Sequence, residues 1–113
     1  MGELLTFTAA GSPRAVSRAI EEVARGQGHV TALVVPWESD GGMLSMSVTA
    51  VRSDGWAIEH TNLGTIRLVE AGPERTEVAV AAEPPAHPDE QRLADVFDRF
   101  IRQVQSRFEG AST

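Results

Sequence analysis

The sequence of 113 residues contains no cysteine, no lysine and no tyrosine. Without cysteine there are no disulfides, no thiol nucleophile and no thiolate ligands for zinc or iron–sulfur clusters. Without lysine there is no amine that could form a Schiff base and no P-loop lysine for a phosphate. All 10 basic residues are arginines, scattered along the chain. Chemistry is therefore left to histidine, arginine, carboxylates and apolar side chains.

Positive charge is also scarce, because 10 basic residues stand against 16 acidic ones for a formal net charge of −6. Nucleic-acid binding needs a surface that neutralises phosphates, so we expect no nucleic-acid partner. No apolar run approaches the roughly 20 residues that cross a bilayer. The apolar segment at 4–10 lacks the positive residues that precede the apolar region of a signal peptide. We expect a cytoplasmic protein without a membrane span, built as a single domain over residues 1–113 with a short tail at 110–113.

Two segments have the three- and four-residue apolar spacing of amphipathic helices. The first begins at Ser12-Pro13, because serine caps the free N–H groups and proline suits the first helical position. It ends near Gly26 and Gly28. The second runs from about Pro88 to Phe108 and has the strongest apolar stripe in the chain.

Between the helices, from His29 to Glu83, apolar and polar residues alternate and turn sequences recur, which is typical of an antiparallel meander. With a strand at 4–10, the pattern predicts a curved antiparallel sheet of about five to six strands. Each strand has one apolar face, and packing that face on helices makes two layers. The predicted fold class is α+β, with the sheet packed on the long C-terminal helix and with one N-terminal helix. The clearest turns are Asp40-Gly41-Gly42, Ser53-Asp54-Gly55 and Gly72-Pro73-Glu74.

Three stretches of the chain carry a resemblance to a known superfamily. They are the helix start Ser12-Pro13-Arg14-Ala15-Val16, the turn and strand Gly72-Pro73-Glu74-Arg75-Thr76-Glu77-Val78, and the long helix at the end of the chain. With the order of elements, they resemble the helix-grip superfamily of START lipid-transfer domains, polyketide cyclases and pollen allergens. The resemblance implies a two-layer sandwich whose sheet grips the last helix, with a ligand cavity between them.

A candidate ligand site follows from the alternation of the strands. The strand near Trp56 places Ile58 and His60 on the same face, and we expect that face to point toward the C-terminal helix. Apolar residues between the sheet and this helix either line a pocket or fill the core. The expected ligand-binding residues are Met46, Trp56, Ile58, His60, Leu68, Phe97 and Phe100. The corresponding function is a small soluble module that binds an apolar small molecule or a lipid-like ligand, without a cofactor.

Histidine is the residue that suggests an enzyme instead. His60 could act as general base of a cyclase- or dehydratase-like enzyme, since its pKa is ordinarily close to neutrality. The alternative is a structural histidine that is hydrogen-bonded to a neighbour. The other two histidines, His29 and His87, begin a strand and lie in a proline-rich connection, so no three-histidine metal site is expected.

A third hypothesis is a homodimeric interaction domain. If Val30 and Ala32 face inward, then Leu33, Val35 and Trp37 form an apolar row on the outer face of the same strand. Exposed apolar rows often mark a partner surface. The alternative is that the first helix or a loop covers this row.

Overall fold

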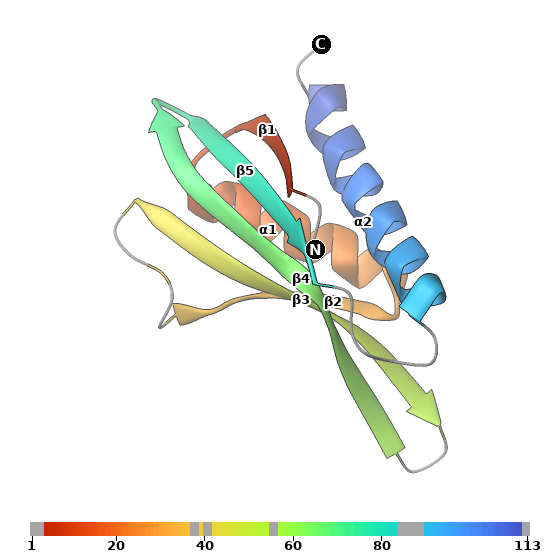
Figure 1. Cartoon of the computed structure of the whole chain (residues 1–113). Coiled ribbons are helices and arrows are strands. Elements are labelled where there is room, and N and C mark those ends of the chain that lie inside the picture. Colours follow the sequence, from red (N-terminus) through yellow and green to blue (C-terminus); the bar gives the residue numbers. More distant parts are fainter. Residues whose placement is uncertain (1–3, 37–38, 40–41, 55–56, 84–89, 112–113) are drawn as a thin grey trace.

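The computed structural model describes residues 4–36, 39, 42–54, 57–83 and 90–111. These residues form five strands in one antiparallel sheet, with the order β1-β5-β4-β3-β2. The two helices and one face of the sheet share a single hydrophobic core (Figure 1). The predicted α+β fold class, with a curved sheet, one N-terminal helix and a long C-terminal helix, is therefore confirmed. The elements are β1 (Leu4–Ala10), α1 (Pro13–Gln27), β2 (Val30–Val34), β3 (Met43–Asp54), β4 (Ala57–Gly72), β5 (Arg75–Ala82) and α2 (Glu90–Ala111).

The ends of α1 are set by the residues that the sequence indicated. The Ser12 hydroxyl accepts a hydrogen bond from the Ala15 N–H at 3.2 Å, and Pro13 occupies the first turn. At the other end Gly28 adopts a left-handed conformation, with φ of 80°. A residue with a Cβ would be strained there, so glycine ends the helix.

The hydrophobic core lies between the two helices and the inner face of the sheet. Paired residues from neighbouring strands, such as Met46 with Ile66 and Leu68 with Val78, point to this face together. Buried hydrophobic residues are Ala9, Val16, Ile20, Ala24, Val30, Ala32, Met46, Val48, Leu63, Ile66, Leu68, Val78, Val80, Phe97, Phe100, Ile101 and Val104.

The predicted turn at residues 72–74 joins β4 to β5, and it is tied to the corner between β1 and α1. Glu74 has a φ of 53°, and its carbonyl accepts a hydrogen bond of 2.6 Å from the Gly11 N–H. The buried Thr76 hydroxyl donates to the Gly11 carbonyl at 2.8 Å. These two bonds hold together chain segments that are more than sixty residues apart.

The largest departure from the sequence-based prediction is a β-bulge in β4. The alternation predicts separate strands at 56–61 and 65–68, but the structure has one strand of 16 residues. Val48 pairs with Gly64 and the next residue, Thr49, pairs with Asn62, so Leu63 is an extra residue on β4. An extra residue shifts the side-chain alternation by one. Residues on the arm side of Leu63 therefore face the opposite way from what uninterrupted alternation predicts.

Gly64 lies at this bulge because the two layers approach each other closely there. A Cβ at this position would be 2.8 Å from Cζ of Phe97 and would also overlap the carbonyl oxygen of Ala81. The Phe97 ring of α2 therefore rests directly on the backbone of β4. Since any larger residue would separate them, this contact sets the local spacing between helix and sheet.

Beyond the bulge, residues 49–54 and 57–62 form a hairpin that we call the β3–β4 arm. The strand β4 has 16 residues at about 3.3 Å each, whereas the 22 residues of α2 rise only about 1.5 Å each, so the strand is the longer element even with its bulge. The arm consequently extends past the first turn of α2 (Figure 1).

The helix α2 is longer at its C-terminal end than the sequence predicted. It continues past Phe108 to Ala111, so the expected tail at 110–113 begins later, while Pro88 lies outside the described residues. Arg107 of α2 forms an ion pair of 3.1 Å with Glu22 of α1. One turn earlier, the Gln27 side-chain amide of α1 donates to the Gln103 side chain. These polar contacts join the two helices at the rim of the core.

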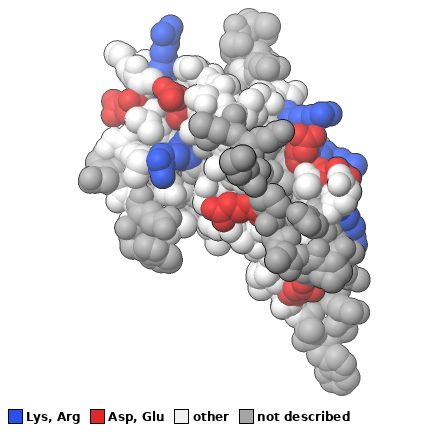
Figure 2. Space-filling view, viewed as in Figure 1, with Lys and Arg blue, Asp and Glu red and all other residues white. Residues whose placement is uncertain are grey.

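Charge on the described surface is mixed in sign. Figure 2 shows acidic and basic side chains interspersed on one face of the molecule, with uncharged surface between them.

The Gly64→Ala substitution should lower the free energy of unfolding by about 2 kcal/mol, because its methyl group must displace Phe97 or the β5 backbone. Chemical denaturation measures this change.

Gly26→Ala is the matched control. Gly26 lies inside α1 with no heavy atom within 4 Å of an added Cβ, so this variant should gain about 0.5–1 kcal/mol. Equal effects of the two substitutions would contradict the close contact at Gly64.

Candidate functional site

Four of the predicted ligand-binding residues lie together between the sheet and α2. Met46 and Leu68 come from neighbouring strands, and Phe97 and Phe100 face them from the helix. The exposed fraction is 0% for Met46, Leu68 and Phe100 and 6% for Phe97. A side chain that lined a void large enough for water would retain accessible surface. These four residues are consequently packed as core.

Two other predicted residues, Ile58 and His60, lie elsewhere. His60 pairs with Val51, whose neighbour Ala50 points into the core, so His60 is on the outer face of the arm. His60 is exposed, and Ile58 is 64% exposed. The prediction that this face points toward α2 is wrong, because the bulge at Leu63 reverses the alternation. Trp56 lies outside the described residues.

The consequence for catalysis is direct. A general base must reach the bound substrate within hydrogen-bond distance. Because His60 lies on the opposite face of the sheet from the core, it cannot act on a molecule held between sheet and α2. The position of His60 therefore removes the geometric basis of the cyclase- or dehydratase-like reading.

The apolar interior does reach the surface at one end, which we call the core end. It lies where α2 begins and where the β3–β4 arm leaves the body. Leu93 is one helical turn before Phe97 and is half-buried, as is Val96 on the adjoining side of the helix. From the sheet, Ala50 and its pairing partner Thr61 are also half-buried. Leu63 and Phe97, which lie close to these residues along the chain, are buried.

The sequence contained part of the signal for the core end. Leu93 and Val96 belong to the apolar stripe of the second helix, but their partial exposure depends on how far α2 extends along the sheet. Thr61 was placed on the outer face by simple alternation. Only the bulge turns it inward.

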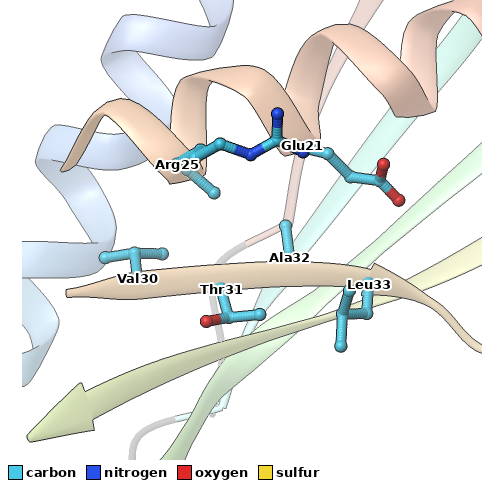
Figure 3. A pocket seen from close by; sticks show the side chains of 7 residues that line it. Glu21, Arg25, Val30, Thr31, Ala32 and Leu33 are labelled. Carbon is cyan, nitrogen blue, oxygen red and sulfur yellow. The ribbon is translucent and has the colours of Figure 1, made fainter. Parts of the chain in front are cut away.

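A concave surface lies between α1 and β2 (Figure 3). It is an open groove of about 200 Å³ with Glu21 and Arg25 on the helix side and Leu33 on the strand side. Ligand pockets for drug-sized molecules measure about 300–1,000 Å³, so this groove is too small for one. Its full lining is Glu21, Ala24, Arg25, Val30, Thr31, Ala32 and Leu33.

The apolar row of the third hypothesis is only partly visible. Leu33 is 58% exposed and Val35 is half-buried, while Trp37 lies outside the described residues. The Val35 N–H donates to the Ser45 carbonyl at 2.8 Å, which extends the pairing of β2 with β3 by one residue.

Within the described part of the chain, no group of three or more histidine or acidic side chains is placed to hold a metal ion. Nor is any helix among those residues long and apolar enough to cross a membrane.

Comparisons with known proteins reveal two similar solved structures. A START superfamily protein from Mycobacterium smegmatis has 15% sequence identity and a TM-score of 0.40, with 97% of this chain and 98% of that chain covered. The Zhui aromatase/cyclase from Streptomyces sp. R1128 has 11% identity and a TM-score of 0.39, with coverage of 94% and 87%. At these values of identity and TM-score, neither likeness carries a conclusion about the ligand or the activity of this chain.

No protein family matches the sequence, and no curated protein does either. The functional assignment has to come from the chain's own residues.

The placement of His60 can be tested by stability. His60→Ala should change the free energy of unfolding by less than about 0.5 kcal/mol, because the side chain is exposed. Leu63→Ala, at the bulge, should cost about 2–4 kcal/mol because Leu63 is 2% exposed. A loss above about 1.5 kcal/mol in the His60 variant would instead place this side chain against the core.

Proposed function

We propose that this chain is a binding module for an apolar small molecule or lipid-like ligand, which it holds at the core end. The observation that carries the proposal is the set of half-buried apolar side chains that α2 and the sheet present there together. Leu93 and Val96 lie on the helix side and Ala50 on the strand side. A ligand that covered them would gain about 25 cal/mol for each Å² of apolar surface removed from water.

The chemistry of this surface favours an uncharged ligand body. The inner-face side chains that border it on the strands are Ala50, Leu63 and the hydroxyl of Thr61. The Thr61 hydroxyl donates to the Glu59 carboxylate at 3.5 Å. Its oxygen can still accept a hydrogen bond from a donor at one end of the ligand. Recognition would rest on apolar contact with one or two hydrogen bonds, as in most small-molecule sites.

The depth of binding is limited by packing. Met46, Leu68 and Phe100 have no accessible surface, so a ligand can reach them only if α2 moves away from the sheet. Phe97 on Gly64 is the contact that such a movement would break. We therefore place the ligand body against Leu93 and Val96, outside this contact.

Calorimetric titration with 1-decanol and with an uncharged naphthalene-based compound tests the proposal, since these two probes represent flexible and planar apolar ligands. Leu93→Gln should weaken binding of the active probe about tenfold, because it replaces a half-buried apolar side chain with a polar one.

Ala94→Gln is the control, since Ala94 lies on the exposed side of the same helical turn. It should bind like the original chain. Binding that is equally weakened in both variants, or the absence of binding by either probe, would contradict a ligand site at the core end.

A further inference from the structure

Residues 30–35 have the composition of a segment that aggregates. They include no charged residue, no glycine and no proline, and four of the six are β-branched. Short uncharged segments of high β-propensity are the type that stack into cross-β structure when they are exposed on an edge. In the fold this segment is β2 with one further residue, since the Val35 N–H also bonds to β3, at the Ser45 carbonyl.

The strand β2 is the last in the sheet order, so in the part of the chain that the structure describes one of its sides has no neighbouring strand. The Val51 N–H of β3 donates to the His29 carbonyl at 2.8 Å. In an antiparallel pair, every second residue forms such bonds with the neighbouring strand. The odd-numbered residues of β2 therefore bond to β3, and the backbone groups of Val30, Ala32 and Val34 point to the open side.

Turns of the chain close both ends of this open edge. Gly28, in a left-handed conformation, lies just before β2. At the other end the Ser39 N–H donates to the Pro36 carbonyl at 3.1 Å, so the chain turns there, and proline has no N–H to offer. A strand that paired along the whole edge would consequently be centred on Ala32.

A positive charge lies over this centre. Arg25 extends from α1 across the groove, and Figure 3 shows its guanidinium above Ala32, reaching toward Glu21. An added strand would lie about 4.8 Å from β2, and its inward-facing side chains would enter the groove at this point. The strand would have to displace the guanidinium or cover it, and a covered charge loses its contact with water.

We propose that Arg25 protects the β2 edge and keeps copies of this chain from pairing through it. Two copies can pair along the whole edge only with a twofold axis at Ala32. This axis would place the two Arg25 guanidinium groups beside each other on the same face of the joined sheet, and such like-charge contacts oppose association. Charged side chains and proline commonly protect exposed edges in this way. The role is independent of the ligand proposed for the core end.

Light scattering over a concentration series tests the proposal. Arg25→Ala should associate about fivefold faster than the original chain, because the like-charge contact is lost. The substitution also makes the net charge more negative, and a larger net charge alone would slow association. Arg99→Ala is the matched control, since it removes an exposed positive charge from α2, and it should not associate faster. Neither should Arg25→Glu, in which like charges still meet across the axis.

Amide hydrogen exchange locates the association. In Arg25→Ala the N–H groups of Val30, Ala32 and Val34 should become protected as concentration rises, whereas in the original chain their exchange should not depend on concentration. The denaturation midpoint of Arg25→Ala should equal that of the original chain, because this side chain is exposed.

Three results would overturn the proposal. One is an Arg25→Ala variant that associates no faster than Arg99→Ala. Another is an Arg25→Glu variant that associates as fast as Arg25→Ala, since a charge at this position would then give no protection. The third is association that leaves the three edge amides unprotected or that accompanies a lowered denaturation midpoint, since it would then arise from another surface or from unfolded chains.

Discussion

The close approach of Phe97 to Gly64 is the contact on which the two-layer arrangement depends. It fixes the height of α2 above the sheet at the point where β4 carries an extra residue. On one side of this contact, the core is packed without accessible surface at Met46 or Phe100. On the other side, the strands continue past the first turn of α2. The Phe97–Gly64 contact therefore marks the boundary between the closed core and the half-exposed apolar surface.

The sequence predicted the elements well because each has local causes. Ser12 and Pro13 begin α1 through capping and a preset φ angle. The turn at 72–74 is confirmed, and Gly72 supplies one of its positive φ angles. The apolar residues of α2 recur every three or four positions, which puts them on one face of a helix but on both faces of a strand. These properties depend on neighbours within a few residues and can be read from a single chain.

The faces of the arm could not be predicted in this way. The sequence Asn62-Leu63-Gly64 resembles a break between strands, and only pairing with β3 shows that it is a bulge. Because alternation was counted without the extra residue, His60 and Ile58 were assigned to the wrong face. Likewise, core and pocket are made of the same residue types. Whether Met46 or Leu93 is accessible depends on where α2 begins relative to the sheet, which is a tertiary property.

The bulge also separates the molecule into parts that can change independently. On β4, odd-numbered residues such as Thr61 face inward before Leu63, whereas even-numbered residues such as Ile66 face inward after it. Insertion of a single residue between Val48 and Thr49 would give Leu63 a pairing partner on β3 and remove the bulge. It would exchange the inner and outer faces of the arm, bringing His60 and Ile58 inward, while the pairing of Met46 with Ile66 stayed in place. Homologues that differ by one residue at this position would thus present opposite arm surfaces on the same scaffold.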